Sequence, residues 1–416
     1  MGSFSSKNTA HPKPYSNMFH PYKYFLDKVI SFLMPFFLPF HLMAYNSSTD
    51  VSTQRTKEAL EKFRKVLNAT SVVDPSLVLA SCDIEIRRDE HILSTMCGLD
   101  ATLYDSYSRR RVDSDEGVKL CTYLVSSEKS KQTSNESTVQ INDLSSIDPS
   151  IPVFVWYHGG GMMSGVATDP IGTTLYAKEF AKEQSKIVGG SEVQILVISI
   201  EYRLSPEYPF PAGIIDCLSA MKFVLETSCS KSINIGGISA GGNMAAVVAL
   251  ECHRRYPGKV KSALIHSPML SPETDSKSYY MNSTSSGTCP ASWLRWCWRA
   301  YLDLGKYPEN LEGDPVKAMR DLVQKSKMKA SSELWRLCTA NEIPPGVDKP
   351  NATKFVVTTA MADVLCDDGV GFAKRLEEKG ANVSHIPAQG SHVFAHVFDS
   401  EAAKRLNRAC RSVMFD

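Results

Sequence analysis

The serine at position 239 has the neighbours that a nucleophilic turn requires. Residues 237–241 are Gly-Ile-Ser-Ala-Gly, an apolar run at 232–236 precedes them, and a helical pattern follows. In the order strand, tight turn and helix, this G-x-S-x-G spacing exposes a serine Oγ that can attack an acyl carbon. Larger side chains at Gly237 and Gly241 would collide with the flanking strand and helix. The alternative is a glycine-rich helix start that the serine merely caps.

Consecutive glycines, beginning at Gly159, follow another apolar run at 153–157. Their bare N–H groups can converge on the oxygen that becomes negatively charged when a nucleophile attacks an acyl group. We predict that the N–H groups of Gly159, Gly160 and Ala240 form this oxyanion hole. Because the glycines lie upstream of the serine motif, this role is favoured over that of a simple flexible turn. His158 is predicted to brace the loop rather than to act as a base.

A serine nucleophile needs a base, and the base needs a carboxylate that orients it. Asp363 follows an apolar run at 354–360, and His392 follows a short run at 382–386. Ser239, Asp363 and His392 therefore occur in the chain order serine, acid, histidine that this turn requires. We predict that they form a catalytic triad.

Other acidic and histidine residues lie near the same positions. Asp367 and Asp368 follow Asp363 closely, but they suit the first turn of the next helix, where carboxylates stabilise the dipole. His396 is the rival base and is expected on or near a helix that faces away. His385 falls within a strand and is a poor candidate.

Short apolar runs alternate with helical patterns through most of the chain, which predicts an α/β fold with a mostly parallel central sheet and helices on both faces. Residues 272–350 interrupt this rhythm with a tryptophan-rich helical stretch, here called the insertion. We expect the insertion and residues 51–110 to form a helical cap over a domain of residues 51–416. The expected strands are 117–126, 153–157, 194–201, 232–236, 263–267, 354–360 and 382–386, and the expected helices are 173–184, 212–226, 241–256, 369–379 and 401–413.

The charge balance and the cysteine spacing limit which kinds of ligand and partner the protein could bind. The 46 basic and 45 acidic residues leave a net charge of +1, so the chain has no field that would attract nucleic acid. A neutral small molecule or a lipid suits it better. The 11 cysteines include no C-x-x-C pair with zinc spacing, and no metal or cofactor is implied. They are interpreted as small buried side chains, with one structural disulfide as the alternative.

Together these motifs resemble the hormone-sensitive-lipase family of α/β-hydrolases, which includes arylacetamide deacetylases. The resemblance covers residues 151–416 apart from the insertion. It implies the α/β-hydrolase fold and the same three triad residues. The matching motifs are His158-Gly159-Gly160-Gly161, Tyr202-Arg203-Leu204-Ser205-Pro206-Glu207, Pro209-Phe210-Pro211-Ala212, Gly237-Ile238-Ser239-Ala240-Gly241-Gly242-Asn243, Asp363-Val364-Leu365 and His392-Val393-Phe394.

The chain departs from the family pattern at three points. Ile238 stands where the family usually has Asp or Thr, and Val393 stands where glycine is usual. Neither change alters the nucleophile or the base. The insertion is longer and more helical than the family pattern predicts. The sequence therefore does not define the acyl pocket.

The resemblance implies a serine carboxylic-ester hydrolase that acts on apolar or lipid-like acyl esters. The alternatives are an arylamide or acetyl deacetylase and a non-catalytic member that binds a ligand. Retention of all three triad residues argues against the last, because binding members of the family have lost the histidine.

Residues 1–50 form an N-terminal segment whose apolar part, about 24–44, is long enough to anchor the protein in a membrane. Lysines before it and their absence just after it place the N-terminus in the cytoplasm and the remaining chain across the membrane. The interpretation is an endoplasmic reticulum membrane protein with a lumenal catalytic domain. The alternatives are a cleaved signal peptide, N-myristoylation at Gly2, and a cytoplasmic enzyme associated with membranes or lipid droplets.

Glycosylation tests this placement. N-x-[ST] sequons are frequent in the chain, which makes it a candidate glycoprotein if it faces the lumen. We expect endoglycosidase to increase the gel mobility of protein isolated from its own cells. Unchanged mobility would count against the lumenal placement. The sequons begin at Asn46, Asn68, Asn135, Asn282, Asn351 and Asn382.

Overall fold

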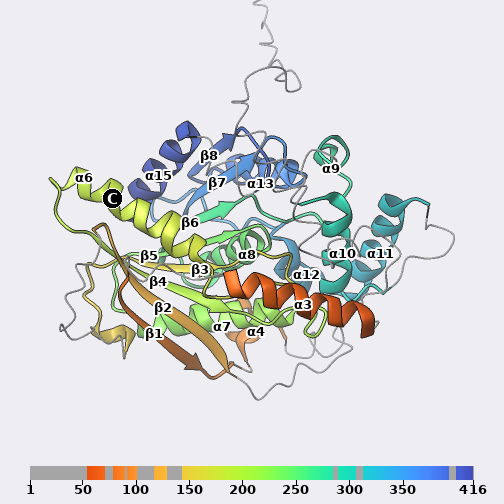
Figure 1. Ribbon diagram of the computed structural model, residues 1–416, viewed down its shortest axis with the longest axis horizontal. Helices are drawn as coiled ribbons and strands as arrows, with labels where there is room; N and C mark the ends of the chain where they lie inside the picture. The colour runs from red at the N-terminus through yellow and green to blue at the C-terminus, as the bar shows by residue number, and fades with distance from the viewer. Residues whose placement is uncertain are drawn as a thin grey trace, which may run out of the picture.

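The computed structural model describes residues 54–70, 78–89, 91–100, 117–128, 143–283, 289–305, 313–392 and 400–415. Its centre is an eight-stranded sheet with the order β1-β2-β4-β3-β5-β6-β7-β8 (Figure 1). β1 and β2 run antiparallel to their neighbours, whereas the pairs from β4 to β8 are parallel. The strands are β1 (Val78–Ile86), β2 (Val118–Ser126), β3 (Val153–Tyr157), β4 (Gln194–Glu201), β5 (Ile233–Ile238), β6 (Val260–His266), β7 (Lys354–Ala360) and β8 (Val383–Ala388).

The central strands are apolar throughout because both of their faces are covered. In β3, Val153, Val155 and Tyr157 belong to one buried cluster, while Phe154 and Trp156 belong to another. Successive side chains of a strand point to opposite faces, so the two clusters are the two faces of the sheet. The expected mostly parallel sheet with both faces covered is confirmed.

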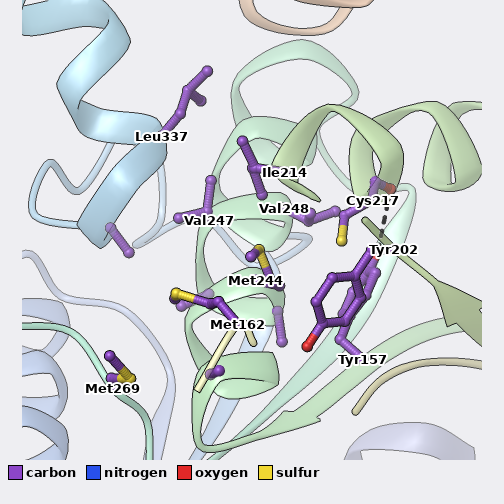
Figure 2. Packing of buried hydrophobic residues seen from close by; sticks show 14 of the residues in the cluster. Tyr157, Met162, Tyr202, Ile214, Cys217, Met244, Val247, Val248, Met269 and Leu337 are labelled. Carbon is purple, nitrogen blue, oxygen red and sulfur yellow. Dashed lines mark hydrogen bonds between the residues drawn. The ribbon is translucent and has the colours of Figure 1, made fainter. Parts of the chain in front are cut away.

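Helices cover each face (Figure 1). One face carries α6 (Lys178–Ile187) and α15 (Ser400–Phe415), and the π-helix η3 (Ile171–Ala177) leads into α6. The other carries α4 (Ile92–Cys97), α7 (Ala212–Thr227), α8 (Ala240–Arg255) and α13 (Cys366–Glu378). A short 3₁₀ turn, η2 (Leu144–Ser146), precedes β3. Figure 2 shows the buried cluster around α8, which includes Met244, Val247 and Val248 of this helix, Tyr157 of β3 and Tyr202, the residue after β4.

The expected strands and helices are present, with their ends shifted by a few residues. One strand was not expected. Val78–Ile86, within the stretch assigned to the cap, forms the outer strand of the sheet beside β2. Its more buried residues Ala80, Cys82, Ile84 and Ile86 alternate with exposed polar residues, which is the pattern of a half-buried strand. It pairs with a strand about 40 residues further along. All eleven cysteines are free thiols, and eight of them are buried.

The insertion contains α9 (Lys277–Met281), α10 (Ala291–Tyr301), α11 (Pro315–Lys329) and α12 (Ser332–Thr339), which gather at the right-hand end of the molecule in Figure 1. α3 (Gln54–Thr70) meets them through the rings of Phe63 and Trp293, whose centroids are 5.9 Å apart. The predicted anchor at residues 24–44 lies outside the described residues. No described helix combines the length and apolarity that crossing a membrane requires.

A buried carboxylate ties three segments together near the antiparallel end of the sheet. Asp216, on α7, has a side chain that is only 1% exposed. Arg203, from the loop after β4, donates to it from Nε and Nη2 at 2.8 Å each. Arg88, after β1, donates from Nε at 2.6 Å. Removing this carboxylate leaves two largely buried guanidinium groups without their shared partner.

We predict that Asp216→Ala lowers the free energy of unfolding by about 3–5 kcal/mol, because the uncompensated charges stay buried. Urea unfolding measures this as a lower midpoint at unchanged slope. Glu378→Ala is the control, since its pair with Lys374 is exposed at 61% and 72% and should contribute less than about 1 kcal/mol. Equal midpoints for Asp216→Ala and the control would contradict the prediction.

Candidate active site

Ser239 occupies a sharp turn between β5 and α8. Its φ of 58° and ψ of −119° lie in a region that residues with a side chain rarely adopt. The turn is held from both sides, because Ser239 N–H donates to the carbonyl of His266 at 2.9 Å and its carbonyl accepts from Met269 N–H at 3.0 Å. These two hydrogen bonds fix the backbone of Ser239 at the carboxyl end of β5, and α8 begins at the next residue.

The turn leaves no room for side chains on its flanking glycines. A Cβ on Gly237 would lie 2.1 Å from the carbonyl oxygen of Gly241, and one on Gly241 would lie 2.0 Å from that of Tyr157. Both distances are far shorter than any van der Waals contact. The expectation that these positions must be glycine is confirmed, and the second distance shows that the turn presses on the end of β3.

The glycine loop after β3 lies against the same turn. A Cβ on Gly159 would come within 3.5 Å of Ser239 Cβ, and the φ of Gly160 is +114°. The Gly160 carbonyl is occupied by the N–H groups of Met163 and Ser164, at 3.1 and 3.0 Å. The N–H groups of Gly159 and Gly160 donate no hydrogen bond to any residue that the structure describes. They are available to a ligand beside the serine.

His158 is fully buried beneath this loop. Its ring stacks on Tyr202 with centroids 4.2 Å apart, and the Tyr202 hydroxyl donates to the His158 carbonyl at 2.7 Å. Its Nδ1 donates to the Gly159 carbonyl at 2.8 Å. Burial lowers the pKa of His158 to about 4, so the ring is neutral at pH 7. These contacts fit the bracing role expected for His158.

Asp363 and His392 meet beyond the ends of β7 and β8. His392 Nδ1 lies 2.6 Å from Asp363 Oδ2, and Asp363 is fully buried while His392 is 6% exposed. The second carboxylate oxygen, Oδ1, accepts from Leu365 N–H at 3.0 Å. Both oxygens of the carboxylate are thus engaged, which fixes its plane and gives His392 one orientation.

The hydroxyl of Ser239 and Nε2 of His392 make no hydrogen bond to any described residue. The pair therefore lacks the serine–histidine bond in this conformation, as is common in sites without substrate. The rival base His396 lies outside the described residues. His385 is in β8 as expected, with Nε2 3.0 Å from the Thr359 hydroxyl. Asp367 and Asp368 lie in the first turn of α13, also as expected.

Several residues that support the site were missed from the sequence. Arg64 of α3 donates to the carbonyls of Met163 at 2.6 Å and Ser205 at 2.8 Å, which ties this helix to the glycine loop. Cys297 of α10 covers the loop so closely that a Cβ on Gly161 would lie 2.4 Å from its Sγ. No short motif could have revealed these contacts, because the partners are about 100 or more residues apart.

Asp368 lies at the start of a helix as expected, and its carboxylate also holds a second segment of the backbone. Its Oδ2 accepts from the N–H groups of Leu270 and Ser271, at 2.8 and 2.9 Å, in the segment that follows β6. Burial raises the pKa of Asp368 to about 7. Among the described residues, no cluster of His, Cys, Asp and Glu has an arrangement that could hold a metal ion.

Residues 154–396 match the protein family described as the alpha/beta hydrolase fold. This span is more than half of the chain and contains Ser239, Asp363 and His392. The chain is an α/β-hydrolase. The membership expected from the motifs is thereby confirmed.

This α/β-hydrolase is also similar to individual curated proteins. It is 26% identical to arylacetamide deacetylase of Oryctolagus cuniculus, across 55% of this chain and 65% of that protein. It is 26% identical to neutral cholesterol ester hydrolase 1 of Bos taurus, across 55% and 64%. A carboxylesterase of Mycobacterium tuberculosis is 38% identical over 107 residues, across 24% and 29%. The chain spans less than two thirds of the length of these relatives.

Solved structures share the fold of this α/β-hydrolase. A hyperthermophilic esterase from the archaeon Pyrobaculum calidifontis superposes with a TM-score of 0.56, across 94% of this chain and 97% of that one. A bacterial heroin esterase has the same TM-score, across 86% and 92%. Their sequence identities are 20% and 19%.

We predict that Gly241→Ala destabilises the protein by at least about 1–3 kcal/mol, because the added carbon must displace the backbone of β3. Gly371→Ala is the matched control. Its Cβ would meet only Arg375 Nη1, at 3.5 Å, and alanine is favoured in a helix. Urea unfolding of both variants is the measurement. A Gly241→Ala midpoint equal to that of the wild type would show that the turn does not press on β3.

Proposed function

We propose that this α/β-hydrolase is a serine carboxylic-ester hydrolase with Ser239 as nucleophile, His392 as base and Asp363 as orienting acid. The observation that supports this most is the 2.6 Å bond between His392 Nδ1 and the buried Asp363 carboxylate, beyond a sheet edge that also carries the turn of Ser239. A neutral histidine held in this way keeps its proton on Nδ1. Its Nε2 is then free to accept a proton.

In the first half of the reaction, Ser239 Oγ attacks the carbonyl carbon of the ester while His392 Nε2 accepts the hydroxyl proton. The carbonyl oxygen becomes an oxyanion and accepts hydrogen bonds from the N–H groups of Gly159, Gly160 and Ala240. Removing one such donor typically costs about 2.7–4 kcal/mol of transition-state stabilisation. The tetrahedral intermediate then collapses. The C–O bond to the alcohol breaks, and His392 donates its proton to the leaving oxygen.

The second half releases the acid. Water enters the position of the alcohol and donates a proton to His392 Nε2 as its oxygen attacks the acyl carbon. The second tetrahedral intermediate breaks the bond to Ser239 Oγ, which recovers the proton from His392. The ester and water have become an acid and an alcohol, and the enzyme is unchanged.

The acyl group is proposed to be apolar or lipid-like. The similar proteins include a neutral cholesterol ester hydrolase and an arylacetamide deacetylase, and the second keeps arylamides as the alternative substrate class. Met162, Met163 and the tryptophans of the insertion are buried at 8% exposure or less. They belong to the large buried cluster around the site.

The wider placement of the enzyme is also a proposal. Residues 24–44 would anchor it in the endoplasmic reticulum membrane, with a lumenal domain of residues 51–416 capped by parts of 51–110 and by the insertion. The charge asymmetry around the apolar run and the sequons support this placement. Asn351 and Asn382 are exposed and accessible to a glycan.

We predict that the purified protein hydrolyses short p-nitrophenyl esters and that Ser239→Ala reduces kcat by about 10⁴-fold or more, because the acyl-enzyme cannot form. Release of p-nitrophenol measures both rates. Ser267→Ala is the control, because Ser267 is a buried serine directly after the neighbouring strand β6. Its turnover should stay within a few-fold of the wild-type value. No turnover by the wild type, or equal turnover by the wild type and Ser239→Ala, would refute the proposed esterase activity.

The two alternatives give different results in the same assay. A series of p-nitrophenyl esters of increasing acyl length, extended to arylamides, ranks esterase, lipase and deacetylase by kcat/KM. A non-catalytic binding protein would hydrolyse none of them, and ester addition would still raise its melting temperature.

A further inference from the structure

The loop that carries Asp363 is held on the side of β8 by the backbone. Met361 N–H donates to the Ala388 carbonyl at 3.0 Å, and Ala362 N–H donates to the Gly390 carbonyl at 2.9 Å. These two bonds continue the pairing of β7 with β8 past the ends of both strands. They tie the acid loop to the segment that leads into His392.

The loop is also held by α9 of the insertion and by the residue that follows this helix. Asn282, which follows α9, donates from Nδ2 to the carbonyls of Met361 at 3.1 Å and Asp363 at 2.8 Å. Both partners are carbonyl oxygens, so only the NH₂ group of the amide can face them. One side chain therefore joins the two ends of the short segment from Met361 to Asp363.

Ser278 extends the same contact. Its hydroxyl donates to the Val364 carbonyl at 2.6 Å, and its N–H donates to Asp367 Oδ2 at 2.7 Å. The Asp363 carbonyl also accepts from Cys366 N–H at 3.2 Å, so the bond from Asn282 completes its two acceptor positions. The peptide planes that follow Asp363 and Val364 are thereby fixed.

We propose that Asn282 is a positioning residue for the hydrolysis: its amide holds the backbone of the acid loop so that Asp363 orients His392. The inference rests on the proposed function. It follows from the geometry, because the carboxylate plane is set by the bonds from Leu365 N–H and His392, and both require the loop conformation that Asn282 holds. A displacement of about 1 Å at such a site can cost roughly 10²-fold in rate.

The same geometry opposes a sugar at this sequon. An N-linked glycan replaces one hydrogen of Nδ2 and leaves a single N–H, whereas Asn282 uses its NH₂ group for two carbonyls. A glycosylated Asn282 could therefore make at most one of these two hydrogen bonds. The exposed sequons at Asn351 and Asn382 carry no such constraint.

We predict that Asn282→Ala lowers kcat for p-nitrophenyl esters by about 10–100-fold while KM changes less than about twofold, because the loss is one of orientation rather than of substrate binding. Asn282→Asp should lose at least as much, since its carboxylate would face two carbonyl oxygens. Asn351→Ala is the matched control, and Thr284→Ala removes the sequon while keeping the amide. Both should retain the kcat of the wild type.

Hydrogen exchange supplies a readout that does not depend on turnover. In Asn282→Ala we expect faster exchange in the peptide covering residues 361–366, with the strands of the sheet protected as in the wild type. An Asn282→Ala enzyme with unchanged kcat, or a loss reproduced by Thr284→Ala, would overturn the inference. So would a loss accompanied by equally faster exchange throughout the sheet, which would indicate general destabilisation. A wild-type protein without Ser239-dependent turnover would refute the proposed function, and with it the positioning role, whatever the exchange result.

Discussion

The site depends on one close approach between two backbones. The turn of Ser239 meets the end of β3 with so little space that a single carbon on Gly241 would lie 2.0 Å from a carbonyl oxygen. This contact brings the serine and the glycine loop together, since both sit at the carboxyl ends of adjacent parallel strands. It also explains the unusual φ of Ser239, a strain on the order of 1–3 kcal/mol that only a rigid surrounding sheet can maintain.

The two halves of the site are stabilised in different ways. On the side of Ser239, glycines, a stacked His158 and the covering Cys297 give a tightly packed loop with little polar exposure. On the acid side, a network of hydrogen bonds holds a carboxylate that is entirely removed from solvent. A buried carboxylate is tolerated only when its oxygens are satisfied, so the acid loop needs partners on every side.

Local patterns were sufficient for most of the fold and for the residues proposed to react. Apolar runs such as 153–157 and 354–360 could be placed because buried parallel strands are continuous in hydrophobicity. Ser239 and the glycines could be found because a close backbone approach demands particular residue types. β1 was missed although its apolar and polar residues alternate from Ala80 to Ile86, and Asn282 was missed because its two printed partners are carbonyls. A carbonyl belongs to every residue and leaves no trace in the sequence.

The hydrogen bonds between α9 and the acid loop also define where this protein can be divided. The first part of the insertion, through Asn282, is bonded to the loop of Asp363, whereas α10 covers the glycine loop. Chimeras that exchange the cap with another family member should therefore join after residue 282 rather than at Pro272. A junction at Pro272 would bring in a foreign support for the carboxylate together with the foreign cap.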